Sequence, residues 1–255
     1  MALKGVIWDF DGTMSQTGMR QYLWFQQWAK DNGKTLVHEG NPLDTFSKFM
    51  GFYNTVIQAN GPQGVYDALG LPCTMNDKSH PVWVGYERFK RENPVQLYPG
   101  IADAVRLFQR LGLKQGINTT NKIASIEKEL VQAGILAVFD SVITEETLAD
   151  YHGAGNQEAI KKPSKISLYL ALEELGIAGD EAVHVGDTVN DLAASKRVMR
   201  LNPRRFVDIY VVGMTYGFEG REVLNKGVET PNGTLHFDAL ADNAEGLVEI
   251  VARLL

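Results

Sequence analysis

From Pro99 onward, short apolar runs alternate with stretches of helical periodicity, and this alternation constrains the fold more than any other feature. Strands are predicted at Leu113–Thr119, Val138–Thr144, Ala182–Val185 and Ile209–Gly213. Helices are predicted after Pro99-Gly100 and over Ile123–Ala133 and Ser164–Leu175. Repeated alternation of strand and helix is typical of a parallel, doubly wound sheet. We therefore predict an α/β fold.

Another strand is predicted near the N-terminus, where Val6, Ile7 and Trp8 form a short apolar run. Between it and Pro99 lie aromatic-rich helical stretches joined by Gly- and Pro-containing turns, predicted at Met19–Asp31, Asp44–Asn60, Gln63–Leu69 and Pro81–Arg91. This order predicts that residues 1–15 and 96–255 form the core and that residues 16–95 form an inserted, all-helical cap domain. Aromatic residues at helical spacing are expected to fill the cap core: Trp24, Phe25, Trp28, Phe46, Phe49 and Phe52.

Two acids, Asp9 and Asp11, directly follow the first predicted strand. In an extended backbone they point the same way, at the carboxyl end of the strand, where open α/β sheets bind ligands. Gly12 would let the backbone turn toward an anion, and Thr13 would add a hydroxyl donor. The alternative is an ordinary turn after a strand, in which Asp, Gly and Thr are common.

Three later segments place polar residues at the ends of predicted strands or beside a helix start: Thr120-Asn121, Lys162-Pro163 and Gly186-Asp187 with Asp191. Each has a local explanation as a helix cap, a solvated lysine or a first-turn acid. Their order along the chain nevertheless puts all of them at the carboxyl edge of the sheet, where a doubly wound fold builds its site. We therefore predict that they belong to one site.

The composition argues against several kinds of partner. A formal net charge of −6 with no long Lys/Arg run predicts no binding to nucleic acid or to an anionic membrane. No apolar run reaches the roughly 18 to 20 residues of a membrane span. Cys73 is the only cysteine, which excludes an intrachain disulfide and fits a cytoplasmic location. Small solutes are the expected partners.

These segments together resemble the four motifs of the haloacid dehalogenase-like hydrolase superfamily. The matching residues are Asp9-Phe10-Asp11-Gly12-Thr13, Thr120-Asn121, Lys162-Pro163, and Gly186-Asp187 with Asp191. Tyr98-Pro99-Gly100 and Thr215-Tyr216-Gly217-Phe218 also resemble the phosphoglycolate phosphatase and β-phosphoglucomutase-like branch, which has a helical cap. The resemblance implies a Rossmann-like core.

Four acids in one small site would repel one another, and Mg²⁺ is the simple remedy for oxygen ligands beside a phosphate. The resemblance implies that Asp9 is the nucleophile and that Asp11 is the general acid and base. It also implies that Mg²⁺ is held by Asp9, by the backbone carbonyl of Asp11 and by Asp187, with Asp191 as a further ligand or as support just outside the ligand shell. Phosphate contacts are expected from Lys162, Gly12, Thr13, Thr120 and Asn121.

The function predicted in this way is a Mg²⁺-dependent phosphatase. It would hydrolyse a small phosphorylated metabolite, such as phosphoglycolate or a sugar phosphate, through an aspartyl-phosphate. The alternative is a sugar-phosphate mutase on the same core, but Phe49–Asn54, the expected specificity loop of the cap, lacks the arginine of β-phosphoglucomutases. The presence of Asp11 argues against a dehalogenase. The length of the chain and its predicted cap argue against a signalling receiver domain. The complete set of acids argues against a catalytically silent binding protein. The protein is expected to be a monomer or a homodimer.

Two segments have no catalytic interpretation. Gly153-Ala154-Gly155 is interpreted as a flexible loop, because the third glycine of a dinucleotide fingerprint is absent. The basic segment from Lys196 to Asp208 is interpreted as a solvated face; it contains Arg197, Arg200, Arg204 and Arg205.

Overall fold

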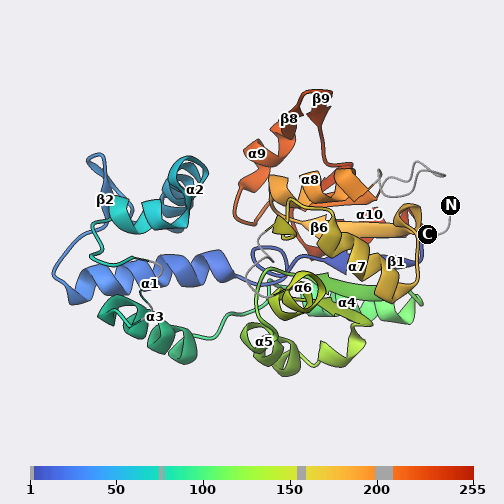
Figure 1. Ribbon diagram of the computed structural model, residues 1–255, viewed down its shortest axis with the longest axis horizontal. Helices are drawn as coiled ribbons and strands as arrows, with labels where there is room; N and C mark the ends of the chain where they lie inside the picture. The colour runs from blue at the N-terminus through green and yellow to red at the C-terminus, as the bar shows by residue number, and fades with distance from the viewer. Residues whose placement is uncertain (1–2, 75–76, 78, 154–158, 199–208) are drawn as a thin grey trace. The chain divides into compact units, whose positions relative to one another are not determined.

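The computed structural model describes residues 3–74, 77, 79–153, 159–198 and 209–255 (Figure 1). Ala154 and Gly155 of the predicted loop, and Arg200, Arg204 and Arg205 of the basic segment, lie outside the described residues. The chain divides into two compact units. One contains residues 1–15 and 97–255, and the other contains residues 16–96. Each unit is described by itself below.

The first unit is built on a six-stranded sheet in the order β10-β7-β6-β1-β4-β5, in which every neighbouring pair is parallel. The predicted α/β class with a doubly wound parallel sheet is therefore confirmed. The strands are β1 (Gly5–Trp8), β4 (Lys114–Asn118), β5 (Ser141–Ile143), β6 (Ala182–Gly186), β7 (Tyr210–Met214) and β10 (Ala239–Ala241).

Helices cover both faces of this sheet, which explains why its strands read as apolar runs (Figure 1). Alternate side chains of β1 enter different clusters: Val6 and Trp8 pack with α4 (Ile101–Arg110) and α10 (Ala244–Ala252). Ile7 packs on the opposite face with α7 (Ile166–Leu175) and α8 (Val189–Val198). The period of two along the strand thus fixes which helices each side chain meets.

The strand order reverses at β1, and this positions the site. The chain runs from β1 through β4 to β5 on one side, then returns to β6 beside β1 and continues to β7 and β10. In open α/β sheets, ligands bind outside the carboxyl ends of the strands at such a reversal. Asp9 follows β1 and Asp187 follows β6, so both acids lie at this point.

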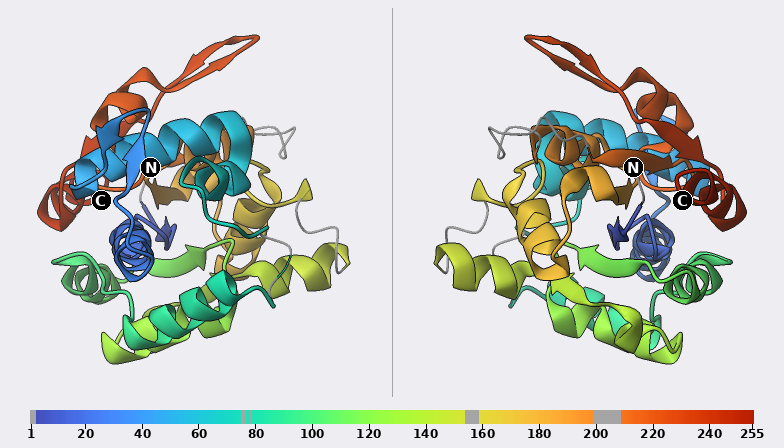
Figure 2. Two further views of the ribbon diagram at one scale, coloured as in Figure 1. Left: turned by 90° about the vertical axis from the view of Figure 1, so that its left-hand side faces the viewer. Right: turned by 90° about the vertical axis from the view of Figure 1, so that its right-hand side faces the viewer.

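The remaining elements of the first unit differ in part from the prediction. The predicted helix Ile123–Ala133 is interrupted at Ile126, whose φ of −120° allows its side chain to be fully buried. It consists of a 3₁₀ turn, η1 (Ile123–Ser125), and α5 (Glu127–Gln132). Elements that the sequence analysis did not predict are η2 (Leu136–Val138), α6 (Glu145–His152), η4 (Gly179–Glu181), α9 (Gly220–Lys226), β8 (Val228–Thr230), β9 (Gly233–Leu235) and β10. Figure 2 shows the β8–β9 hairpin extending away from the six-stranded sheet.

The second unit contains α1 (Thr17–Asp31), α2 (Phe46–Ala68) and α3 (Pro81–Glu92). The two helices predicted at Asp44–Asn60 and Gln63–Leu69 are joined in α2 across a kink at Gly61, where φ is +68°. A two-stranded ladder, β2 (Val37–His38) with β3 (Asn41–Pro42), was not expected in an all-helical unit. Most of the predicted aromatic core is present, since Trp24, Phe25, Trp28, Phe49 and Phe52 are buried, whereas Phe46 is only half-buried.

The interpretation of Phe49–Asn54 as a specificity loop is wrong, because this segment lies inside α2. Thr45 caps the helix by accepting a hydrogen bond from the backbone of Lys48, and Phe49, Phe52 and Val56 follow at helical spacing. Their burial, rather than a ligand, accounts for the apolar character of the segment.

The chain leaves and re-enters the first unit at two neighbouring points. Ser15 and Leu97, at the two points where the chain leaves and re-enters the first unit, form an antiparallel bridge. Asp11 also forms a bridge with Ser15, so the segment after β1 folds back before the chain leaves. Both ends of the insertion are therefore tied to one place in the first unit.

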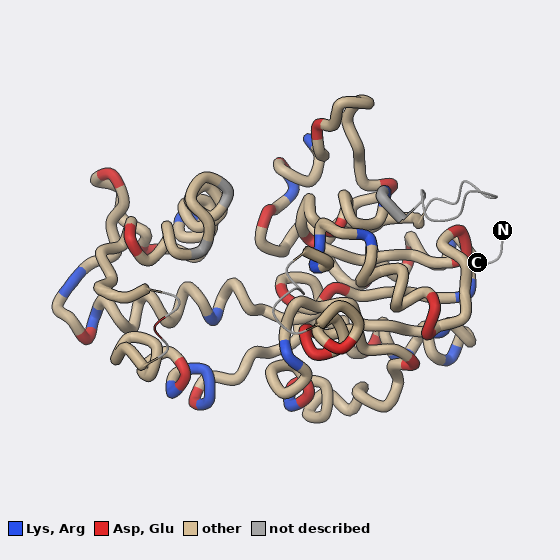
Figure 3. Tube along the Cα trace, viewed as in Figure 1, with Lys and Arg blue, Asp and Glu red and all other residues tan. Residues whose placement is uncertain are grey.

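Charged residues of both signs are interspersed along the described trace (Figure 3). Within the described residues, none of the helices is both long enough and apolar enough to cross a membrane.

Candidate active site

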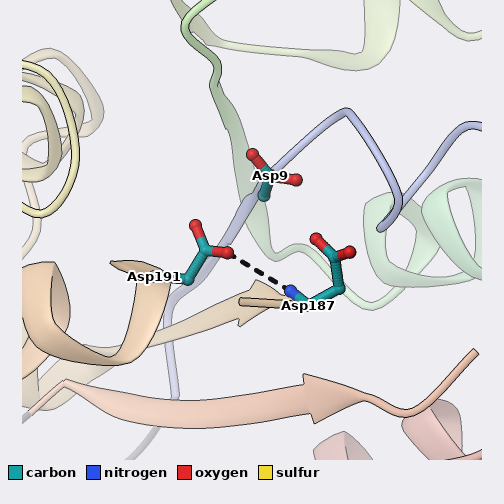
Figure 4. Close-up of side chains that lie close together, drawn as sticks. All are labelled: Asp9, Asp187 and Asp191. Carbon is teal, nitrogen blue, oxygen red and sulfur yellow. Dashed lines mark hydrogen bonds between the residues drawn. The ribbon is translucent and has the colours of Figure 1, made fainter. Parts of the chain in front are cut away.

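Three buried aspartates meet at the carboxyl edge of the sheet. Asp9 follows β1, Asp187 follows β6, and Asp191 lies in the first turn of α8 (Figure 4). One carboxylate oxygen of each lies within 4.8 Å of the others, and none of the three residues is more than 6% exposed. Because buried carboxylates repel one another, this arrangement requires positive charge nearby.

Lys162 supplies part of that charge. Its ammonium forms an ion pair with Asp9, a second with Asp191 at 2.8 Å, and a hydrogen bond to the carbonyl of Asn118 at 3.1 Å. The lysine side chain is only 7% exposed. One cation therefore faces three acids, and the buried site keeps an excess of negative charge.

The pKa values reflect this imbalance. Burial raises the pKa of Asp9 to about 7, while Lys162 acts in the opposite direction and Asp191 and Asp11 act in the same direction. Burial and the charge of Asp9 raise the pKa of Asp187 well above its ordinary value. Burial also acts upward on Asp191, but attraction to Lys162 prevails and lowers its pKa. In the protein without a metal, protons therefore compete for Asp9 near neutral pH, and burial favours the protonated form of Asp187 as well.

Asp187 is held by neutral donors. The hydroxyl of Thr13 donates to its Oδ1 at 3.0 Å, and the backbone N–H of Phe218 donates to its Oδ2 at 2.6 Å. Gly12 has a φ of +79°, and a Cβ there would lie 2.2 Å from Oδ2 of Asp187. Glycine is therefore required at position 12 for both conformation and space.

Asp191 is fixed by the turn that begins α8. Its Oδ2 accepts hydrogen bonds from the hydroxyl of Thr188 at 2.6 Å and from the backbone N–H groups of Thr188 and Asp187 at 3.1 and 3.3 Å. The last of these bonds is drawn in Figure 4. Oδ1 remains directed to Lys162. The predicted proximity of Asp187 and Asp191 is thus present in the structure.

Asp11 has a different environment from Asp9. It is half-buried, and its Oδ2 accepts a hydrogen bond from Nδ2 of Asn121 at 2.5 Å. Asn121 follows β4, the neighbour of β1, so two motifs from adjacent strand ends meet in this contact. An acid that is partly exposed and held by an amide is suitable for exchanging a proton with a ligand.

A pocket of about 400 Å³ opens over these residues. It is lined by Asp9, Asp11, Thr120, Lys161, Lys162, Asp187, Thr188, Asn190, Asp191 and Phe218. Lys161, Thr188, Asn190 and Phe218 were not predicted as site residues. Lys161, Thr188 and Asn190 are adjacent to the predicted residues Lys162, Asp187 and Asp191. Phe218 belongs to the segment Thr215–Phe218, which was noted only for its family resemblance.

Three groups that were predicted to donate hydrogen bonds to phosphate donate them to acceptors within the protein in this structure. The backbone N–H of Gly12 donates to the carbonyl of Ser15, and the hydroxyl of Thr13 donates to Asp187. The backbone N–H of Asn121 donates to the hydroxyl oxygen of Thr119. Thr120 is exposed and lines the pocket, as does Lys162.

The residues present fit Mg²⁺. The candidate ligands Asp9, Asp187 and Asp191 offer only oxygen atoms, and Mg²⁺ prefers oxygen ligands and few carboxylates. Burial is the main cause of the raised pKa values of Asp9 and Asp187, and a divalent cation would favour the ionised form of both. Soft ligands are absent from this described cluster, which argues against metals that prefer sulfur.

The family model of the haloacid dehalogenase-like hydrolases matches residues 3–198, which is most of the chain. The chain belongs to this family. The predicted resemblance is therefore confirmed, and with it the expectation that the protein is an enzyme of a hydrolase family.

Relatives of this hydrolase include protein CbbY and a phosphoglycolate phosphatase. It is 34% identical over 204 residues to protein CbbY of Cereibacter sphaeroides, a match covering 76% of this chain and 80% of CbbY. It is 28% identical over 130 residues to a phosphoglycolate phosphatase of Colwellia psychrerythraea. That second match spans 51% of this chain and only about half, 49%, of the relative.

A solved structure of CbbY from Rhodobacter sphaeroides in complex with phosphate has the same fold as this hydrolase. Its TM-score is 0.58 with 22% identity, and the match covers 95% of each chain. At this identity the likeness shows the fold alone. The region of the match includes both the sheet and the inserted helical unit.

Proposed function

We propose that this hydrolase is a Mg²⁺-dependent phosphatase that cleaves a small phosphomonoester through an aspartyl-phosphate on Asp9. The observation that carries the proposal is the position of Asp9. It is buried against Lys162, beside Asp187 and Asp191, and it opens on a pocket that Asp11 also lines. The relationship to CbbY and to a phosphoglycolate phosphatase supports a phosphorylated substrate.

In the first step, a carboxylate oxygen of Asp9 attacks phosphorus, and the bond from phosphorus to the leaving oxygen breaks. Asp11 donates its proton to that oxygen, so the product leaves as an alcohol. In the second step, Asp11 accepts a proton from water as the water attacks the aspartyl-phosphate, which releases phosphate. Asn121 keeps the carboxyl group of Asp11 in one orientation for both proton transfers.

Phosphoryl transfer depends mainly on alignment and charge stabilisation. We assign this task to Lys162 and Thr120, which line the pocket, and Lys161 adds a second cation there. Phosphate contacts from Gly12, Thr13 and Asn121 stay predictions. When bound by Asp9, the Asp11 carbonyl, Asp187 and Asp191, Mg²⁺ would supply positive charge that orients the phosphoryl group.

The test is phosphate release from a panel of phosphorylated metabolites that includes phosphoglycolate, pentose and hexose phosphates, bisphosphates and nucleotides. We expect release with Mg²⁺, no release with a chelator, and a phosphorylated Asp9 peptide in acid-quenched samples. Activity that survives Asp9→Asn would refute the mechanism. An isomerised sugar phosphate without phosphate release would instead identify the mutase.

We also propose that residues 16–95 serve as the cap that selects the substrate, while residues 1–15 and 96–255 carry the chemistry. Arg20, in the first turns of α1, has a buried Nε without an acceptor among the described residues. Arg20→Ala should change the ranking of substrates by kcat/KM, whereas Arg91→Ala at the end of α3 should not. An unchanged ranking across substrates of different size and charge would count against this role.

A further inference from the structure

The loop that follows β7, residues Thr215–Glu219, contacts the second acidic segment from two sides; we call it the post-β7 loop. The backbone N–H of Phe218 donates to Asp187 at 2.6 Å. The carboxylate of the next residue, Glu219, accepts a hydrogen bond from the backbone N–H of Val189 at 2.6 Å. Two consecutive residues of this loop therefore hold the two ends of the Asp187–Val189 turn.

The backbone of this loop lies against the carboxylate of Asp187. A Cβ built on Gly217 would lie 2.2 Å from Oδ2 and 2.3 Å from Cβ of Asp187, distances that no side chain tolerates. Gly217 is therefore needed for the close approach of the two chains, as Gly12 is on the other side. The carboxylate of Asp187 lies between two glycine backbones.

The loop also contacts the first acidic segment. The hydroxyl of Tyr216 donates to the backbone carbonyl of Thr13 at 2.7 Å, and Thr13 in turn donates its own hydroxyl to Asp187. The beginning of the loop is fixed by Thr215, whose hydroxyl donates to Asp242. The post-β7 loop thus bridges both acidic segments, although it supplies none of the carboxylates in the Asp9–Asp187–Asp191 cluster.

Glu219 lies where it can fix the position of Asp191 through the start of α8. Val189 is the first residue of α8, and the first N–H groups of a helix have no partner inside the helix. A carboxylate at this end satisfies one of them and interacts favourably with the helix dipole. Asp191 is only two residues further along the same helix, so an acceptor that fixes Val189 also fixes the turn that presents Asp191.

We infer that Glu219 is a positioning residue for the metal-holding acids. By accepting the Val189 N–H, it keeps the start of α8, and with it Asp191, in place beside Asp187. This role rests on the proposed function, because it assumes that these acids hold a divalent cation. Groups that orient metal ligands in this way typically change metal affinity 10- to 100-fold when removed.

The experiment compares Glu219→Ala with Glu219→Gln, which keeps an oxygen acceptor but loses the charge. Glu222→Ala is the matched control, because Glu222 is an exposed acid of α9 that pairs with Lys226. Mn²⁺ affinity is measured by electron paramagnetic resonance on the full chain, and the Mg²⁺ concentration for half-maximal activity is measured separately. Circular dichroism with a chelator present shows whether each variant is folded.

We expect Glu219→Ala to weaken Mn²⁺ binding about 10-fold or more and to raise the half-maximal Mg²⁺ concentration equally. Glu219→Gln should recover most of this loss, and Glu222→Ala should match the wild type. Unchanged Mn²⁺ affinity in folded Glu219→Ala, or equal losses in the Ala and Gln variants, would overturn the inference.

If Glu219→Ala does not fold, Val189→Pro removes the donor instead, at a first helical position where proline is well tolerated. It should weaken Mn²⁺ binding to the same extent, and full affinity in this variant would overturn the inference. Mn²⁺ binding by a wild type that hydrolyses no phosphomonoester would count against the proposed function alone, since the effect of Glu219→Ala on Mn²⁺ affinity could still be measured.

Discussion

The two acidic segments of the site, Asp9–Thr13 and Gly186–Asp191, are equally deep in the protein but are held in different ways. Asp9 depends on a cation, Lys162, for its hydrogen bonding and charge compensation. Asp187 has two neutral donors, the hydroxyl of Thr13 and the backbone of Phe218. The first segment is therefore stabilised by charge, and the second by precise contacts with distant parts of the chain.

The difference indicates a division of tasks. Lys162 opposes the rise in the pKa of Asp9 and so favours its ionised form, which suits a group that reacts with substrate. The two donors to the Asp187 carboxylate carry no charge, so a divalent cation would act as its counterion, which suits a group that binds a metal. Asp191 combines both features, since it contacts Lys162 through one oxygen and Thr188 through the other.

The largest effect is expected from Asp9→Asn, which replaces the reacting oxygen of the first segment. We predict a fall in kcat of about 10⁴-fold or more, because the nucleophile cannot be replaced by water in the same geometry. Asp11→Asn should cost less, about 10²- to 10⁴-fold, the usual range for losing a general acid and base. Steady-state kinetics with saturating Mg²⁺ would compare the two, and equal residual rates would contradict the separate roles.

Lys162→Met removes the cation on which the first segment depends. Because it leaves Asp9 and Asp191 buried without their counterion, we expect the free energy of unfolding to fall by about 3 kcal/mol and kcat to fall about 10²-fold or more. Urea unfolding in the presence of a chelator would measure the first effect. Lys161→Met, in the same pocket but outside these ion pairs, is the control, and an equal loss of stability there would weaken the comparison.

Thr13→Val tests the contribution of an uncharged hydrogen-bond donor to holding Asp187 in the second segment. It removes a buried donor to Asp187 and keeps the shape of the side chain, so we expect Mg²⁺ to bind about 10-fold more weakly. In contrast to Lys162→Met, kcat at saturating Mg²⁺ should change little. Thr13→Ser, which restores the hydroxyl, should recover the Mg²⁺ affinity, and failure to do so would point to packing instead.

The smallest effect on activity is expected at His184, behind the second segment. Burial lowers the pKa of His184 to about 4, and its Nδ1 lies 2.6 Å from the hydroxyl of Ser195. That hydroxyl donates to the carbonyl of Asp191, so it accepts from His184, whose Nε2 has no partner in the described structure. The native protein therefore holds this histidine neutral.

A depressed folded pKa gives stability that is present above the ordinary value of 6.5 and is lost as the pH falls toward 4. The wild type should lose up to about 3 kcal/mol across this window from His184 alone. Chemical unfolding from pH 7 to pH 4 would show a shallower decline for His184→Gln. Parallel pH profiles for the two proteins would show that the histidine does not titrate as stated.

The sequence predicted those features that depend on local pattern. Alternating apolar runs predicted the parallel sheet, because a strand buried on both faces must be apolar along its length. Asp9, Asp187 and Asp191 could be grouped because strand ends in such a sheet share one edge. The helical spacing of Phe49 and Phe52 likewise predicted a helix, and that helix, α2, leaves no room for a specificity loop at Phe49–Asn54.

The residues that hold the acids of the site in place could not be predicted in the same way. Phe218 and Glu219 act on residues about 30 positions earlier, through a backbone amide and a half-buried carboxylate. Backbone donors carry no signal in the sequence, and a single Glu has many ordinary explanations. The hydrogen bond from Thr13 to Asp187 could not be predicted either, because the two residues are 174 positions apart in the sequence.

The bridge between Ser15 and Leu97 brings the two ends of the inserted unit together. Since the chain leaves and returns at neighbouring points, an insertion of different length or shape can replace residues 16–96 without changing the register of β1 with β4 or β6. Under the proposed role of this insertion in substrate selection, the chemistry of the sheet edge and the choice of substrate can then evolve at different rates. A new specificity would require exchange of one continuous segment, while the acids stay where they are.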